Sequence, residues 1–506
     1  MIFKHTAKLV TVVSVASLVL VGCTPTPPEP VIPNASGAPA EFSAYYEQVA
    51  EFEECGTRLY CADIEVPMDW SDPGSEAISI ATVFRQADSD PKGFILFNPG
   101  GPGASGFDWV KDSSEYLGTK ALRADWNILG FDPRGVGRSS AVWCLSDSEY
   151  DEFLYGVSGS DIGTEEDITA AREATAEFAS KCLENTGPLL EFVDTVSAAK
   201  DMDVLRAVIG ESKLNFLGYS YGSFLGTTYA TLFPERVGRF VLDGAIDPTV
   251  SDFEQTLFQI EAFESALGAF LENCDTYEEC PFSGDSAADQ KTIEQLLLSI
   301  EEEPLPTTSG RDLTIWGAVT GLIMTLYSDR YWSSLATAFS EALNGTGDQF
   351  LYLADSYNDR NADGTYGTNL VAANYAISCL DHSASLSMFT IEQQNATLLE
   401  AAPLLGRYWQ FGGLRCASWP FPEAEKPASY SATGAPTILV IGTTGDPATP
   451  YSQAQSLVNE ILDDGFLMTY NGEGHTIYGQ DVKCIDQVVD KFFLTGELPA
   501  TDPNCS

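Results

Sequence analysis

The chain has 506 residues, with 73 Asp and Glu against 26 Lys and Arg, which gives a formal net charge of −47. This balance argues against a nucleic-acid-binding protein, because neutralising phosphate requires clustered Lys and Arg. Apolar residues make up 44% of the chain and charged residues only 20%, so we expect a folded protein of one large domain with an insertion, or of two domains.

The first predicted element is a targeting segment at residues 1–22. Two lysines precede an uncharged run over 9–21, which is too short for a membrane span of about 20 residues but suits the core of a signal peptide. The run ends at Leu20-Val21-Gly22-Cys23, which resembles the lipobox of bacterial lipoproteins, whose cysteine is acylated. We therefore expect a lipoprotein signal peptide and a membrane anchor on Cys23, outside the cytoplasm. An ordinary cleaved signal peptide is the alternative.

A proline-rich stretch follows the predicted anchor. Prolines favour an extended, semi-rigid spacer, so we expect residues 23–40 to be a linker between the membrane and the folded body. Ten cysteines remain after Cys23, and an even count in an exported chain indicates a disulfide framework. No cysteine pair has the short spacing of a zinc site, and we expect no metal or other cofactor. Proximity in sequence suggests the pairs Cys55–Cys61, Cys144–Cys182, Cys274–Cys280, Cys379–Cys416 and Cys484–Cys505.

A glycine-rich loop follows the predicted strand 94–97. The loop reads Asn98-Pro99-Gly100-Gly101-Pro102-Gly103, and its glycines allow backbone N–H groups to face a substrate without obstruction by a Cβ atom. A phosphate-binding loop is the rival interpretation, but the sequence lacks the Gly-Lys-Ser/Thr ending and the GxGxxG spacing. We expect the Gly101 N–H to donate to an oxyanion.

The centre of the chain carries a candidate nucleophile. A short apolar run at 214–218 is typical of a buried strand, 223–233 has helical spacing, and Gly218-Tyr219-Ser220-Tyr221-Gly222 lies between them. Gly-x-Ser-x-Gly between a strand and a helix is the pattern of a nucleophile elbow, although such a turn alone is also common. We expect Ser220 to be the nucleophile and the Tyr221 N–H to be the second oxyanion donor.

A serine nucleophile requires a base, and the sequence has three histidines, of which one lies in the targeting segment. In α/β-hydrolases the order along the chain is serine, acid, histidine, with the acid after a late strand. The predicted strands 436–442 and 466–470 precede Asp446 and His475, and we expect these two residues to complete a triad with Ser220. His382 is the alternative base and Glu473 the alternative acid.

Five motifs in this order resemble the exported tripeptidyl aminopeptidases of actinobacteria, which are α/β-hydrolases related to proline iminopeptidases. The resemblance covers about residues 41–505 and implies the same triad in a serine exopeptidase that trims short peptides from free N-termini. The proline iminopeptidases have a His-Gly-Gly start where this chain has Asn98-Pro99, and this difference favours the tripeptidyl branch. The motifs are Asn-Pro-Gly-Gly-Pro-Gly at 98–103, Phe-Asp-Pro-Arg-Gly-Val-Gly-Arg-Ser at 131–139, Gly-Tyr-Ser-Tyr-Gly at 218–222, Gly-Asp-Pro-Ala-Thr-Pro at 445–450 and Gly-Glu-Gly-His-Thr at 472–476.

Nearly two hundred residues separate the predicted strands 239–242 and 436–442. Apolar residues at helical spacing in this insertion predict a helical cap over the ends of the strands. We expect an α/β-hydrolase core at 41–245 and 433–506, with a cap domain at 246–432. Aromatic residues in the cap either line a cleft or form the core of the cap: Trp316, Tyr327, Tyr331, Trp332, Tyr408, Trp409 and Phe411.

The predicted function is hydrolysis of short peptides from free N-termini through an acyl-enzyme. An aminopeptidase needs a partner for the ammonium group of its substrate, and we expect a cap carboxylate, either Asp381 or, less favourably, one of Glu301–Glu303. A carboxylesterase or lipase with the same triad is the alternative enzyme, and an inactive solute-binding lipoprotein is the alternative outside enzymes.

Overall fold

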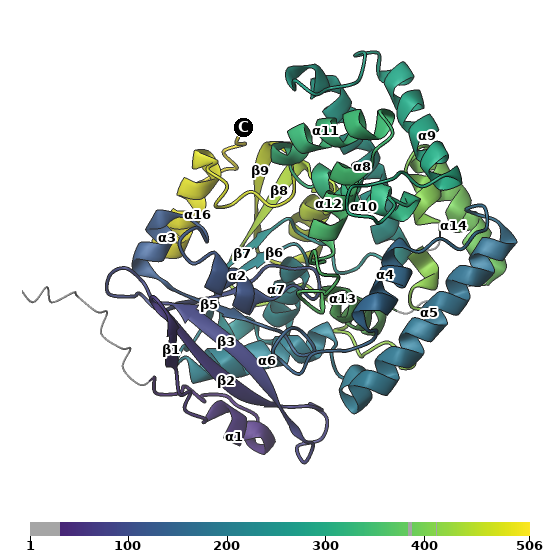
Figure 1. The fold of residues 1–506 in the computed structure, drawn as a ribbon. Coiled ribbons are helices and arrows are strands. Elements are labelled where there is room, and N and C mark those ends of the chain that lie inside the picture. Colours follow the sequence, from purple (N-terminus) through teal and green to yellow (C-terminus); the bar gives the residue numbers. More distant parts are fainter. Residues whose placement is uncertain (1–30, 383–386, 411) are drawn as a thin grey trace, which may run out of the picture.

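The computed structural model describes residues 31–506 except 383–386 and 411, and it shows one sheet with helices on both faces (Figure 1). In this described part nine strands lie in the order β1-β2-β3-β5-β4-β6-β7-β8-β9. They are β1 (Glu53–Gly56), β2 (Leu59–Pro67), β3 (Ala77–Arg85), β4 (Phe94–Asn98), β5 (Asn127–Phe131), β6 (Leu214–Tyr219), β7 (Val237–Asp243), β8 (Ile438–Gly445) and β9 (Gly465–Glu473).

The sheet has an antiparallel part and a parallel part. β1, β2 and β3 pair antiparallel, and β3 continues antiparallel onto β5. From β5 through β4, β6, β7 and β8 to β9 every pairing is parallel. Parallel strands end at a common edge, and ligands bind outside their carboxyl ends. The predicted catalytic loops follow β4, β6, β8 and β9, so they meet at this edge.

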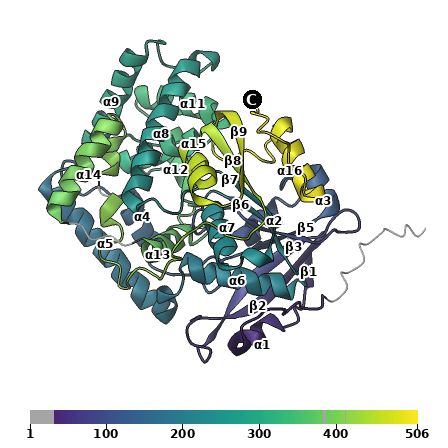
Figure 2. The same cartoon turned by 180° about the vertical axis from the view of Figure 1, so that it is seen from behind.

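Helices cover both faces of the sheet, as the two opposite views show (Figure 1 and Figure 2). Each face has its own apolar cluster, and most residues of both clusters are fully buried. On one face lie α1 (Ser43–Tyr46), α6 (Thr195–Val208), α7 (Tyr221–Leu232) and α15 (Tyr451–Ser456), and on the other α2 (Gly106–Asp112), α3 (Lys120–Asp125) and α16 (Lys483–Thr495).

The predicted helical insertion is present between β7 and β8, and the α/β-hydrolase fold with a helical cap is confirmed. Phe270, Phe339 and Phe350 are fully buried in an apolar cluster that belongs mainly to the cap. Trp332 and Tyr408 are buried in the same cluster, while Phe411 is outside the described residues. The helices are α8 (Asp252–Asn273), α9 (Ser286–Glu302), α10 (Ile315–Leu326), α11 (Trp332–Leu343), α12 (Asp348–Tyr357), α13 (Leu370–Asp381) and α14 (Met388–Ala401).

One part of the predicted core lies against the cap instead. Between β5 and α6 the chain forms α4 (Asp147–Tyr155) and the long helix α5 (Glu165–Thr186), and α5 runs beside α14 in both views. Ile168 of α5 packs with Ile391 and Leu414 of the cap. The cap therefore gains support from a segment that precedes the nucleophile in the chain.

The segment before the sheet is bound to the body from Asn34 onward. The Asn34 N–H donates to the Ala207 carbonyl at 2.7 Å, and Arg236 donates to the carbonyl of Gly37. The end of the predicted linker 23–40 is thus docked on the core, whereas Cys23 lies outside the described residues.

All five predicted disulfides are present, Cys55–Cys61, Cys144–Cys182, Cys274–Cys280, Cys379–Cys416 and Cys484–Cys505. None of the described helices combines the length and the apolar character needed to cross a membrane. Within the described ranges, no three His, Cys, Asp or Glu side chains are grouped so that they could hold a metal ion.

Candidate active site

Ser220 lies in a strained turn between β6 and α7. Its backbone has φ 55° and ψ −124°, a left-handed conformation that a non-glycine residue seldom adopts. The turn is held by hydrogen bonds, because the Ser220 N–H donates to Asp243 O at 2.9 Å and the Ser223 hydroxyl donates to Ser220 O at 2.6 Å. A Cβ atom on Gly218 would lie 2.4 Å from Gly222 O, so the tight turn requires glycine there. The elbow predicted from the motif is present.

Asp446 and His475 are joined by a hydrogen bond. Nδ1 of His475 lies 2.9 Å from Oδ2 of Asp446 and 3.0 Å from Oδ1. Asp446 follows β8 and is buried, and its Oδ1 accepts the N–H groups of Ala448 and Thr449, both at 2.9 Å. The Thr449 hydroxyl donates to Oδ2 at 2.9 Å. This carboxylate is therefore fixed by its own loop and directed at the ring.

His475 is held from both the cap and the core. The backbone N–H of His475 donates to Tyr327 O at 2.8 Å. The Tyr327 ring packs edge-on to the imidazole, with 5.6 Å between the ring centroids. A Cβ atom on Gly244 would lie 2.9 Å from Cε1 of His475, so the ring covers the end of β7, where the Ser220 N–H is bound. Burial opposes the charged ring, but the carboxylates of Asp446 and Asp243 outweigh it and raise the pKa of His475.

A second carboxylate lies beneath the histidine loop. Oδ2 of Asp243 accepts the N–H groups of Ile477 at 2.9 Å and Tyr478 at 2.7 Å, and Oδ1 is buried without a hydrogen-bond partner. Burial raises the pKa of Asp243 to about 6. Its position at the end of β7 fixes the loop that carries His475.

Neither the alternative base, His382, nor the alternative acid, Glu473, takes part in the hydrogen bond between Asp446 and His475. His382 directly follows α13, its ring lies 6.3 Å from that of Phe224, and burial lowers the pKa of the imidazole. Glu473 packs against Gly445, where a Cβ atom would meet its carboxylate. The structure thus pairs Asp446 with His475, in the chain order that the motifs predict.

The glycine-rich loop after β4 passes directly over the elbow. Gly100 and Gly101 have φ values of 100° and 107°. A Cβ atom on Gly100 would lie 2.6 Å from Tyr219 O, 2.9 Å from Cβ of Ser220 and 3.2 Å from Tyr221 N. Because Tyr221 is the first residue of α7, its N–H has no acceptor within the helix. The predicted donors Gly101 and Tyr221 therefore belong to two adjoining segments.

Asp381 is the last residue of α13 and packs against Thr195, the first residue of α6. Its side chain is buried, and both carboxylate oxygens accept hydrogen bonds from Thr195. Burial raises the pKa of Asp381 to about 7. These contacts do not favour the predicted role in binding a substrate ammonium. In the alternative cluster, Glu301 accepts a hydrogen bond from Arg407 at 2.6 Å.

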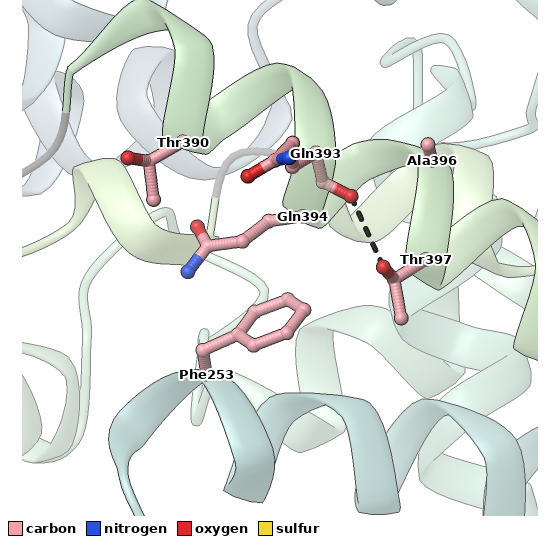
Figure 3. A pocket seen from close by; sticks show the side chains of 6 residues that line it. All are labelled: Phe253, Thr390, Gln393, Gln394, Ala396 and Thr397. Atoms are coloured by element: carbon pink, nitrogen blue, oxygen red, sulfur yellow. Dashed lines mark hydrogen bonds between the residues drawn. The ribbon is translucent and has the colours of Figure 1, made fainter.

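Two hollows accompany the cap. One, of about 210 Å³, is bordered by His475 and Gly474 on the core side and by Ser328, Asp329 and Arg330 on the cap side. The other, of about 460 Å³, lies between α8 and α14 and is lined by uncharged side chains (Figure 3). In that view Phe253 lies across from Gln394. His475 therefore lines a hollow at the junction of cap and core.

Sequence reasoning missed several residues of this site. Thr449 stands three residues after Asp446 in the same motif, so its contact with the carboxylate had a local signal. Asp243 is an acidic residue directly after the apolar run Phe-Val-Leu at 240–242, which is also a visible signal. Tyr327 is one of the cap aromatics predicted either to line a cleft or to form the cap core, but its contact with His475 had no local signal, and neither did that of Thr195 with Tyr221, because both arise from tertiary packing.

Comparisons with known proteins show to which family the chain belongs. A family model described as "TAP-like protein" matches residues 402–505. Serine protease Hip1 of Mycobacterium tuberculosis is 33% identical over 482 residues, which cover 93% of this chain and 91% of that protein. Carboxylesterase B of the same species is 33% identical over 96% of this chain and 92% of its own length. The tripeptidyl aminopeptidase of Streptomyces lividans is 29% identical over 88% of this chain and 84% of its own. With a strained Ser220, an Asp446–His475 pair and this similarity over almost the whole chain, the protein belongs to the family of TAP-like α/β-hydrolases and is a serine hydrolase.

Proposed function

We propose that the protein is a serine exopeptidase that removes short peptides from free N-termini through an acyl-enzyme on Ser220. The observation that carries the proposal is the hydrogen-bonded Asp446–His475 pair over the end of β7, where the strained Ser220 is bound. The names of two relatives, a serine protease and a tripeptidyl aminopeptidase, support peptide bonds as the target.

In the acylation step, His475 acts as the general base. Asp446 accepts from the Nδ1–H, which leaves Nε2 unprotonated and able to take the proton of the Ser220 hydroxyl. The serine oxygen attacks the scissile carbonyl, and the N–H groups of Gly101 and Tyr221 stabilise the oxyanion that forms. The imidazolium then gives its proton to the leaving amine as the C–N bond breaks.

In the deacylation step, water replaces the amine. His475 takes a proton from the water, the resulting hydroxide attacks the acyl carbon, and the same two N–H groups hold the second oxyanion. Collapse returns the proton to the oxygen of Ser220 and releases the peptide acid. The raised pKa of His475 suits both directions of proton transfer near neutral pH.

The helical cap supports a preference for small substrates. It places Tyr327 on the imidazole and Ser328 to Arg330 around the hollow next to His475. A covered site admits chain ends more readily than the middle of a folded protein. A carboxylesterase is the second candidate, because a relative named carboxylesterase B is as similar as the named protease and an acyl-enzyme mechanism serves both.

We also propose that the enzyme works outside the cytoplasm, anchored to a membrane through an acylated Cys23. Five disulfides among the described residues support an oxidising compartment. Mass spectrometry of the protein isolated from membranes of a host that processes lipoproteins tests this: the mature N-terminus should be a diacylated or triacylated Cys23, and Cys23→Ala should be released from the membrane.

The decisive test of the activity is product analysis with peptides of three to eight residues, each offered with a free and with an acetylated N-terminus. We expect release of short N-terminal fragments from the free peptides only, and none with Ser220→Ala. If acetylation has no effect and only esters turn over, the carboxylesterase is the correct function.

A further inference from the structure

Helix α13 belongs to the cap by its place in the chain but to the core by its packing. Its residues Ala372, Ala376, Ile377 and Leu380 are fully buried in the apolar cluster that contains α6 and α7. Large side chains of the cap helices α8, α10, α11 and α12, such as Phe339, pack in a separate cluster. This helix is therefore fixed relative to the sheet. Its first half touches the loop that carries Gly101, and its last residue is connected to Tyr221 through Thr195.

The first half of α13 lies on the glycine-rich loop. The amide of Asn374 donates from Nδ2 to Pro102 O at 2.9 Å. Its Oδ1 accepts from Arg415, whose guanidinium stacks 4.1 Å above the ring of Tyr375, so both ends of the amide are committed. A Cβ atom on Gly103 would lie 2.9 Å from Leu370 O, which shows how closely the loop and the helix approach.

The last residue of α13 reaches the other donor through a chain of hydrogen bonds. Oδ1 of Asp381 accepts the N–H of Thr195 at 2.9 Å, and Oδ2 accepts the Thr195 hydroxyl at 2.5 Å. The hydroxyls of Thr195 and Tyr221 are also 2.5 Å apart. Because the single hydroxyl hydrogen of Thr195 is directed at Asp381, Tyr221 must donate to Thr195. The chain therefore runs from Tyr221 through Thr195 to Asp381.

All three members of this chain are buried. Tyr221 is 4% exposed, Thr195 1% and Asp381 5%, so no water competes for these groups. Removing one partner from a buried hydrogen bond leaves the other unsatisfied, which costs more than the bond itself contributes. The side chain of Tyr221, and with it the start of α7 next to Ser220, is thus held firmly in one place.

We propose that Asn374 and Asp381 position the oxyanion hole from the cap, Asn374 by holding the Gly101-Pro102 loop and Asp381 by holding Tyr221 through Thr195. The inference rests on the proposed function, since it assigns the two donors to that mechanism. Neither residue contacts a substrate in this role, and both are positioning residues. Oxyanion donors act only when they lie about 3 Å from the developing charge, so a loosened support reduces kcat and leaves substrate binding largely intact.

Three variants test the two arms: Tyr221→Phe and Asp381→Asn for the hydrogen-bond chain, and Asn374→Ala for the loop. Deleting a whole oxyanion donor costs about 10²–10³ in kcat, and we expect loosening one to lower kcat by about 10- to 100-fold, with KM within about twofold. Tyr221→Phe keeps the backbone N–H and the ring, and it serves if Asp381→Asn fails to fold.

Two further measurements separate positioning from general loss of structure. The first compares an ester with the matching thionoester, whose sulfur is a poor hydrogen-bond acceptor. We expect each variant to slow the ester far more than the thionoester, whereas equal slowing of both would overturn the proposal. The second is a double-mutant cycle. Tyr221→Phe with Asp381→Asn should lose no more than the larger single variant, because they break one chain, while Tyr221→Phe with Asn374→Ala should combine multiplicatively.

Asp151→Asn is the matched control. It breaks the ion pair of Asp151 with Arg360, with an N–O distance of 2.6 Å, which ties the cap to α4 without touching either donor. We expect a lower melting temperature and an unchanged kcat. If all variants and this control lower the melting temperature but none changes the ester-to-thionoester ratio, the contacts of α13 are structural only and the proposal is wrong.

The outcomes also distinguish the positioning role from substrate binding by Asp381 and from failure of the proposed function. If Asp381→Asn changes the preference for free over acetylated N-termini, Asp381 binds the substrate ammonium and the positioning role is overturned; we expect both rates to fall equally. If the unmodified enzyme neither hydrolyses esters or peptides nor reacts with a fluorophosphonate at Ser220, the proposed function itself fails. If the unmodified enzyme is active and the variants keep its kcat, only the inference about α13 is wrong.

Discussion

The loops at the carboxyl edge of the sheet and the cap above them are held in different ways. The loop of the acid is held largely by its own neighbours in sequence, because Asp446 accepts the N–H groups of Ala448 and Thr449, while the histidine loop is held by Asp243 at the end of a core strand. The cap meets these loops through contacts between distant residues, such as Asp381 with Thr195, which are 186 residues apart. The chemistry is therefore encoded in short motifs, and the environment of the chemistry is encoded in tertiary packing.

The largest expected effect is on the core side of this comparison. Ser220→Ala removes the nucleophile and should lower kcat by about 10⁶-fold, because the other members of a triad act only through it. Hydrolysis of an activated ester and labelling by a fluorophosphonate measure the loss. Ser71→Ala, at an exposed turn between β2 and β3, is the control and should keep full labelling. Labelling that persists in Ser220→Ala would place the nucleophile elsewhere.

The next effect comes from the contact between the two core loops. Gly100→Ala places a Cβ atom 2.6 Å from Tyr219 O at a φ of 100°, so the loop must move away from the elbow. We expect kcat to fall by about 10²–10³, as for loss of an oxyanion donor. Gly159→Ala has the same sign of φ, at 77°, but no atom within 4 Å of the added methyl group. The Gly159→Ala variant should therefore have the same kind of backbone strain but normal activity. Burst kinetics with an ester measure the activity of both variants.

A smaller effect is expected on the pH profile. His475 must be neutral to act as base, and its raised pKa means that activity is lost on acidification at a higher pH than for an ordinary histidine. Asp243 is one cause of that increase, so Asp243→Asn should lower the pKa of His475 and move the acidic limb of kcat/KM to lower pH.

Asp486→Asn is the control for the pH profile. Asp486 also holds the histidine loop, by accepting the Gly479 N–H at 2.9 Å, but its charge is not among the causes of the raised pKa of His475. In Asp486→Asn, the acidic limb of kcat/KM should stay at the pH of the unmodified enzyme. A limb that moves equally in both variants would mean that loop position, and not the charge of Asp243, sets the profile.

The smallest effect on the chemical step is expected from the interior of the cap. Phe339 is fully buried among the cap helices, and Phe339→Ala should lower the free energy of unfolding by about 3–5 kcal/mol. Labelling by a small fluorophosphonate should remain, while peptide hydrolysis falls. Phe240→Ala, in β7 beneath the elbow, has a similar cost but should slow labelling as well. Equal labelling losses would show that cap and core fold as one unit.

The same division explains what the sequence could predict. The parallel strands were predictable because each is a short apolar run followed by a glycine-rich motif, as at Phe94–Asn98 and Leu214–Tyr219. The order of the motifs along the chain selected Asp446 and His475, which the fold joins by a hydrogen bond, and their action on Ser220 stays a prediction. The predicted disulfides match the structure because every bridge joins two cysteines that are consecutive in the sequence, 6 to 38 residues apart.

What the sequence could not predict depends on packing between distant segments. The residues of α5 have helical spacing, but nothing in them indicates that Ile168 contacts Ile391 of the cap. Asp381 was selected for its charge and for its place in the insertion. Its partners became visible only when α13 was placed against the start of α6, where Thr195 occupies both of its oxygens.

Helix α6 also sets the distance between the start of α7 and the docked N-terminal segment. Its first residue, Thr195, lies next to Tyr221, and its other end receives the Asn34 N–H at the carbonyl of Ala207. At about 1.5 Å per residue, this helix separates the oxyanion hole from the docked N-terminal segment by about 20 Å. The cap helices α9 and α11 lie at the opposite end of the molecule from α1 in both views. Because the N-terminal segment is docked at the carboxyl end of α6, beside α1, it joins the body on the side opposite to these cap helices.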